Sequence, residues 1–136
     1  MRLNEITEEK IYHVTRTASV PRIMKRGLLP LQTSNWIKAG SKERYGSGEI
    51  FAFSDLTDAV RWAGIMDWEF NKTIGSGKIS ILTLRMEGDW EIDTADPLAQ
   101  SSNKGVWLKK FGGVKPEDII SSTPVTSALI KSNKII

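Results

Sequence analysis

The chain has 136 residues, of which 40% are hydrophobic and 26% are charged, and its formal net charge is +3. We therefore expect one ordinary globular domain over 1–136, with its core at about 11–125. The absence of cysteine excludes disulfides and thiolate metal sites, and a single histidine argues against a transition-metal site. The polar, acidic start and the lack of a long apolar run favour a cytoplasmic protein with no membrane partner.

The first predicted elements are a strand and a short helix. Residues 11–15 are rich in β-branched and aromatic side chains, which is typical of a strand. A helix should follow, because Ser19 can cap it, Pro21 is tolerated in its first turn and Gly27 can end it.

A polar segment over 31–49 separates these elements from the next pair. A loop of this length within a compact domain is more often functional than idle. The sequence Ile-Phe-Ala-Phe at 50–53 predicts a buried strand, and Ser54 or Asp55 can cap the helix that follows it.

The second half of the chain is predicted to be mainly strands. After a loop over 71–77, the segment 79–86 is apolar on both faces and should lie inside a sheet or between layers. Shorter strands are expected at 105–108, 119–120 and 123–125. Helices do not alternate with strands throughout, so the fold class is α+β with mainly antiparallel strands.

Two apparent motifs do not predict a site. The sequence Gly-Ser-Gly-Lys at 75–78 lacks the remainder of a phosphate-binding loop and precedes a strand, so we interpret it as a flexible turn. The acidic residues between 87 and 96 are interpreted as a solvated loop, because neither catalytic nor calcium-binding spacing is present.

The one histidine is the strongest candidate for function. His13 and Thr15 are two residues apart on the first predicted strand, so their side chains share a face. An imidazole beside a hydroxyl could bind a ribose diol or an amide. A hydrogen-bonded core histidine is the alternative.

Three segments together resemble the ADP-ribosyltransferase superfamily. The first is Ile-Tyr-His-Val-Thr at 11–15 with the following helix ending in Gly-Leu. The second is Gly-Ser-Gly-Glu-Ile-Phe-Ala-Phe-Ser at 46–54. The third, Asn-Lys-Gly-Val-Trp-Leu at 103–108 with Val-Lys-Pro-Glu at 114–117, is similar to the RNA 2′-phosphotransferases (KptA). The order of the segments matches that family over about 11–120.

The resemblance implies split antiparallel β-sheets with two flanking helices, and NAD bound as a substrate in the cleft between the sheets, with no metal. His13 would contact the nicotinamide ribose, Val14 would present its backbone to the carboxamide, and Thr15 would support both. Phe51 would stack on nicotinamide, with Phe53 as the alternative. The remaining cofactor-binding positions that the resemblance implies are Ser54 and Val106.

The sequence lacks one acidic residue that part of the superfamily carries. Transferases that modify proteins carry a glutamate where this chain has Val106, and a valine cannot stabilise a developing cation. Among the arginines, Arg16 follows Thr15 and Arg44 lies in the long polar segment, so these two are the candidate phosphate ligands. A solvated surface arginine is the alternative for each.

Two functions stay open at this point. One is an NAD-dependent transferase that passes ADP-ribose to a nucleic-acid 2′-phosphate or base, or to a protein side chain. The other is a catalytically degenerate module of the same fold that docks on nucleic acid or a partner protein. The oligomeric state is not indicated by any pattern in the sequence.

Overall fold

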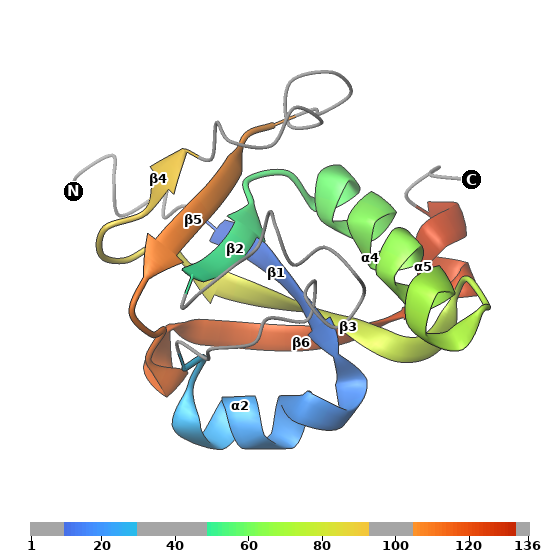
Figure 1. Ribbon diagram of the computed structural model, residues 1–136, viewed down its shortest axis with the longest axis horizontal. Coiled ribbons are helices and arrows are strands. Elements are labelled where there is room, and N and C mark those ends of the chain that lie inside the picture. Colours follow the sequence, from blue (N-terminus) through green and yellow to red (C-terminus); the bar gives the residue numbers. More distant parts are fainter. Residues whose placement is uncertain (1–9, 30–48, 93–104, 133–136) are drawn as a thin grey trace.

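The computed structural model describes residues 10–29, 49–92 and 105–132, which form an antiparallel sheet with helices on both faces (Figure 1). The sheet has six strands in the order β4-β5-β2-β1-β3-β6. In chain order the strands are β1 (Lys10–Arg16), β2 (Glu49–Phe53), β3 (Ser76–Arg85), β4 (Glu91–Ile92), β5 (Trp107–Phe111) and β6 (Ile119–Thr126). The helices are α2 (Val20–Arg26), α4 (Leu56–Asn71) and α5 (Ser127–Ser132). The predicted α+β class and the antiparallel strands are confirmed.

The strand β1 and the helix α2 form where the sequence predicts them. A 3-10 turn over Thr17–Ser19 joins the two elements. Ser19 occupies the N-cap position of α2 without a side-chain capping bond, and Gly27 ends the helix at a φ of 83°. That backbone conformation favours glycine, which has no Cβ to clash.

The helix α4 is the longest helix of the described residues, and its cap is Asp55. The Asp55 carboxylate accepts a hydrogen bond of 2.7 Å from the N–H of Thr57, which satisfies one of the free donors of the first turn. Small and apolar side chains recur on one face of α4 and are fully buried against the sheet; they are Ala59, Val60, Ala63 and Met66.

The start of β3 corrects the prediction for 75–78. This segment is not a flexible turn, because β3 begins at Ser76. The buried carboxylate of Asp67 accepts bonds from the N–H and the hydroxyl of Ser76, and a third from the side-chain amide of Asn71. These bonds join the end of α4 to the first residue of β3.

The C-terminal part of the fold differs from the prediction in three places. The strand predicted at 105–108 starts two residues later, as β5. The two strands predicted at 119–120 and 123–125 are one continuous edge strand, β6, which contains Pro124. The short helix α5 and the two-residue strand β4 were not predicted, and with α5 the described residues form three α-helices where the resemblance implied two.

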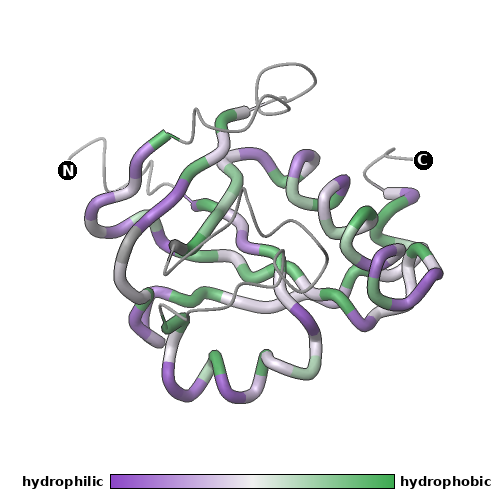
Figure 2. Tube along the Cα trace, in the orientation of Figure 1, coloured by the Kyte–Doolittle hydropathy of each residue, from purple (hydrophilic) through white to green (hydrophobic). Residues whose placement is uncertain are grey.

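The hydrophobic core lies in two layers, one on each face of the sheet. On one face, α4 and α5 cover an aromatic and aliphatic cluster that includes Val14, Phe53 and Trp107. On the other face, Ile23 of α2 packs with Ile11 and aliphatic residues from the remaining strands. Figure 2 shows hydrophobic residues along the strands and, alternating with hydrophilic ones, along the helices. The prediction that 79–86 is apolar on both faces and lies between two layers is confirmed, because alternate residues of β3 belong to the two different core clusters. No helix in the described part of the chain is long and apolar enough to cross a membrane.

Candidate functional site

The sheet consists of two well-paired groups of strands that meet at one residue pair. β1 pairs with β3 along its whole length, from Lys10 opposite Arg85 to Arg16 opposite Ile79. β2 pairs with β5 throughout as well. Between β1 and β2, in contrast, the register rests on a single pair, Tyr12 opposite Phe53. The group β4-β5-β2 is therefore joined to the group β1-β3-β6 mainly at this point.

His13 lies beside that junction and connects the two groups through its side chain. Its Nδ1 is 2.6 Å from the main-chain carbonyl oxygen of Phe51 on β2. A carbonyl oxygen can only accept, so Nδ1 carries the proton and donates it. In the neutral imidazole the other ring nitrogen, Nε2, then has a lone pair that can accept a hydrogen bond.

The surroundings of the ring favour this neutral form. Burial lowers the pKa of His13 below its usual value of 6.5, because a charged imidazolium loses its hydration inside the protein. The bond to the Phe51 carbonyl acts in the opposite direction and is the smaller effect. At neutral pH the site therefore offers an acceptor nitrogen and no positive charge on the ring.

Four of the candidate site residues share the face of the sheet that α2 covers. Strand alternation puts His13 and Thr15 on this face, together with Ser54 at the end of β2 and Val106 before β5. Thr15 is buried, at 2% exposure, whereas Ser54 and Val106 are exposed. The structure thus brings the acceptor nitrogen of His13 and the exposed hydroxyl of Ser54 to the same face of the sheet.

The other described candidates lie on the face that α4 covers. Val14 and Phe53 are core residues there, and the Phe53 ring packs edge-on against Trp107 with the centroids 5.4 Å apart. Phe51 has the same parity as Phe53 along β2, so its ring is directed to the face opposite His13. The guanidinium of Arg16 lies 4.7 Å from the centroid of the Phe70 ring on α4. Arg44 lies outside the described residues.

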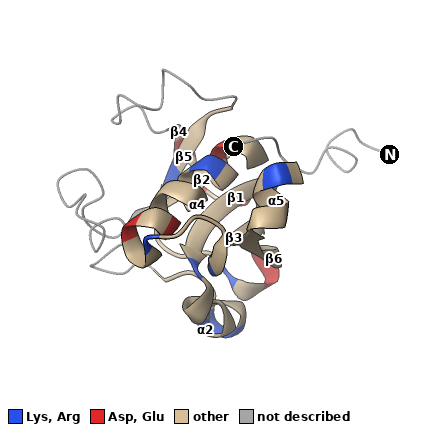
Figure 3. Ribbon diagram, turned by 90° about the vertical axis from the view of Figure 1, so that its right-hand side faces the viewer, with Lys and Arg blue, Asp and Glu red and all other residues tan. Residues whose placement is uncertain are grey.

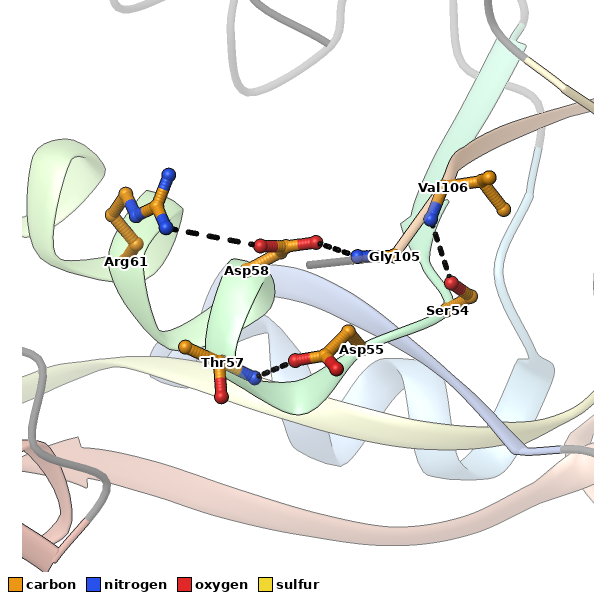
Figure 4. Close-up of polar contacts among 7 residues, drawn as sticks. All are labelled: Ser54, Asp55, Thr57, Asp58, Arg61, Gly105 and Val106. Atoms are coloured by element: carbon orange, nitrogen blue, oxygen red, sulfur yellow. Dashed lines mark hydrogen bonds and ion pairs between the residues drawn. The ribbon is translucent and has the colours of Figure 1, made fainter. Parts of the chain in front are cut away.

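The start of β5 is held against the start of α4 by hydrogen bonds that the sequence did not predict (Figure 4). Ser54 and Val106 exchange two bonds: the N–H of Ser54 donates to the Val106 carbonyl at 3.0 Å, and the N–H of Val106 donates to the Ser54 hydroxyl at 2.8 Å. The carboxylate of Asp58, fully buried, accepts from the N–H of Gly105 at 2.9 Å and lies 3.9 Å from the guanidinium of Arg61.

Asp58 is the residue that sequence reasoning missed. An acid in the first turn of a helix is usually explained by the helix dipole, and no pattern in the sequence connects it to Gly105. Its bond ties the segment 103–108 to α4 at Gly105, which is the first residue of that segment that the structure describes.

Two further polar features complete the description of the site region. The indole N–H of Trp107 is buried and has no hydrogen-bond partner among the described residues. Within the same residues, no three histidine, aspartate or glutamate side chains come together in an arrangement that could hold a metal ion.

Comparison of the sequence with models of known protein families gave no match, and comparison with curated proteins gave none either.

Proposed function

We propose that this chain is an NAD-binding domain of the ADP-ribosyltransferase superfamily, most similar to the RNA 2′-phosphotransferases, with His13 against the nicotinamide ribose. The observation that carries the proposal is the hydrogen bond between His13 Nδ1 and the Phe51 carbonyl. It orients an unprotonated Nε2 at the junction of the two strand groups, where a ribose hydroxyl could donate to it.

The division of the sheet supports the same proposal. The resemblance implies a dinucleotide in a cleft between two sheets, and β1 and β2 are the neighbours at which the sheet divides into two groups. The exposed Ser54 lies on the same face as His13. Its hydroxyl oxygen accepts from Val106, which leaves its proton available to donate to a ligand oxygen.

The chemistry we propose is transfer of ADP-ribose to a 2′-phosphate of RNA. The bond between the nicotinamide nitrogen and ribose C1″ breaks, the electron pair leaves with nicotinamide, and a phosphate oxygen bonds to C1″. A phosphate monoester is already anionic near neutral pH, so it needs no carboxylate to remove a proton. This acceptor suits a site with the exposed Val106 where other transferases have glutamate.

A binding module without catalysis is the second candidate. The observation that favours it concerns Asp58, the acid bonded to the segment that leads into β5. Its carboxylate is fully buried and accepts the N–H of Gly105, so it does not face a substrate. Such a module would dock on nucleic acid or on a protein and would release no nicotinamide.

Calorimetry and thermal unfolding with NAD, ADP-ribose and RNA test the proposal. NAD should bind and raise the melting temperature. The variant His13→Asn can keep a side-chain donor for the Phe51 carbonyl but has no nitrogen in the place of Nε2. It should stay folded and lose the NAD-dependent shift.

Lys131→Asn, an exposed change on α5, is the control and should respond to NAD like the unmodified protein. Absence of any NAD or ADP-ribose binding contradicts the proposal. Salt-sensitive RNA binding that is unaffected by His13→Asn would indicate the docking module instead.

A further inference from the structure

The exposed side of the helix α2 carries three cations and no acidic residue. Arg22, Lys25 and Arg26 are exposed, and their spacing of three and four positions places them on one side of the helix. Ile23, in contrast, is buried in the core between the helix and the sheet. Figure 3 shows α2, with its Lys and Arg segments in blue, at the lower end of the molecule. Among the described residues, no carboxylate forms an ion pair with any of the three cations.

A fourth exposed cation, Lys115, lies beside the end of this helix. Leu28 and Val114 exchange two main-chain hydrogen bonds, of 2.9 and 2.8 Å, so the chain that follows α2 runs next to the chain that leads into Lys115. The 3-10 turn that follows Lys115, over Pro116–Asp118, packs against α2 as well. The structure thus brings cations from two distant segments to one place. We call Arg22, Lys25, Arg26 and Lys115 the α2 surface.

Helix stability accounts for only part of this surface. Lys25 and Arg26 lie in the last turn of α2, where a cation interacts favourably with the negative end of the helix dipole. Arg22 lies in the first turn, at the positive end, and one turn before Arg26, so the two guanidinium groups repel each other. An anion bound beside both groups removes this repulsion. The position of Arg22 therefore suits a bound anion better than it suits the helix alone.

The α2 surface holds as large an excess of positive charge as the whole chain. The neighbouring 3-10 turn contains the acids Glu117 and Asp118. The carboxylate of Asp118 is 3.4 Å from the guanidinium of Arg85, which balances it, and Glu117 is exposed with no ion-pair partner among the described residues. The four cations of the surface and the carboxylate of Glu117 leave three positive charges, and the formal net charge of the chain is also +3. The other charged residues of the chain therefore balance one another in number.

We propose that the α2 surface binds the phosphate backbone of the RNA acceptor. This inference rests on the proposed function and names the surface that holds the RNA beyond the reacting phosphate. A guanidinium binds phosphate oxygens through two parallel hydrogen bonds, and an ammonium adds a point charge. Arg22 and Arg26 are about 6 Å apart along the helix axis, which lets each contact a different phosphate of one strand.

The place of α2 in the fold favours RNA over other anions. The helix packs on the face of the sheet to which His13 and Ser54 are directed. An RNA whose 2′-phosphate lies at His13 can therefore continue over the α2 surface without passing to the other side of the sheet. A single small anion cannot contact the candidate site, the helix and Lys115 together, whereas a strand with a phosphate at every nucleotide can.

Fluorescence anisotropy with a short single-stranded RNA that carries one 2′-phosphate tests the proposal. Arg22→Gln/Arg26→Gln should raise the dissociation constant about tenfold at low salt. The slope of the logarithm of affinity against the logarithm of salt concentration should become shallower by about 1.4, since each phosphate contact of a single strand contributes about 0.7. Lys78→Gln/Lys131→Gln is the matched control, because it removes two exposed cations from β3 and α5. It should change the dissociation constant by less than about twofold.

Glu117→Gln tests the surface in the opposite direction. This change removes the carboxylate beside the cations but keeps the main-chain carbonyl that accepts from Arg85. The variant should therefore bind the RNA more tightly, by roughly two- to threefold at low salt. The melting temperatures of all three variants without RNA should equal that of the unmodified protein, which separates binding from folding.

The outcomes distinguish this inference from the proposed function. NAD binding together with RNA binding that is as strong in Arg22→Gln/Arg26→Gln as in the control overturns the inference and leaves the proposed function intact. Absence of NAD binding, with RNA binding that the double variant weakens, contradicts the proposed function and supports the RNA surface. Binding to vesicles of anionic phospholipid without binding to RNA would assign the α2 surface to a membrane and overturn the inference.

Discussion

The fully buried carboxylate of Asp58 accepts a 2.9 Å hydrogen bond from the main-chain N–H of Gly105. These residues are 47 positions apart in the chain, and their bond joins the first turn of α4 to the segment that leads into β5. Together with the two bonds between Ser54 and Val106, it holds in place one side of the candidate site.

Removing the Asp58 carboxylate should destabilise the protein. Asp58→Ala leaves the N–H of Gly105 without its partner and should lower the free energy of unfolding by about 2–3 kcal/mol. Asp58→Asn keeps an oxygen that can accept from Gly105 and should cost less, about 1 kcal/mol. Urea unfolding followed by circular dichroism measures both. Equal losses for the two variants would show that the acceptor oxygen is not what matters.

Two glycine-to-alanine changes should have opposite effects. A Cβ at Gly105 would overlap the Ser54 hydroxyl and lie 2.9 Å from Asp55 Cβ, so Gly105→Ala should cost about 1–3 kcal/mol. Gly64→Ala introduces no overlap and should stabilise the helix by up to about 1 kcal/mol. Denaturant midpoints of the two variants and the unmodified protein give both values. A Gly105→Ala variant as stable as the unmodified protein would contradict the packing described at Gly105, and a destabilised Gly64→Ala would contradict the open space at Gly64.

The half-buried His13 should make stability depend on pH. Its pKa is lowered in the folded protein from the unfolded value of 6.5, so below that pH the unfolded chain binds more protons than the folded one. The contribution is fully present above pH 6.5 and is lost as the pH falls from 6.5 through the folded pKa. Melting temperatures measured from about pH 8 down to about pH 5 should fall more steeply for the unmodified protein than for His13→Asn. Parallel curves would show that the ring titrates as it does in the unfolded chain.

The transferase chemistry predicts nicotinamide release that depends on the acceptor. With NAD and an RNA that carries a 2′-phosphate, free nicotinamide should form; with the same RNA lacking that phosphate, it should not. His13→Asn should lower the rate at least about tenfold if the ring positions the nicotinamide ribose. Chromatographic measurement of nicotinamide checks this. NAD binding without release under any of these conditions would favour the binding module.

Much of the fold could be predicted because its elements are locally consistent. The β-branched run before His13, the glycine that ends α2 and the alternating apolar residues of β3 each indicate one conformation by themselves. The start of β3 at Ser76 could not be predicted, because bonds from Asp67 hold that residue in the strand. The helix α5 could not be predicted either, because its six residues are too few to form a helix alone. The burial of Ile130 stabilises it in the folded protein.

The sequence by itself determined the α+β class, the place of most elements and the shared face of His13 and Thr15, because these follow from side-chain periods along one segment. Only the tertiary structure decided which strands are neighbours, that β1 and β2 meet at a single pair, and that the imidazole donates to the Phe51 carbonyl. It also directed Phe51 away from His13 and gave Asp58 its distant partner. Those contacts join residues far apart in the chain, and no local pattern of side chains encodes them.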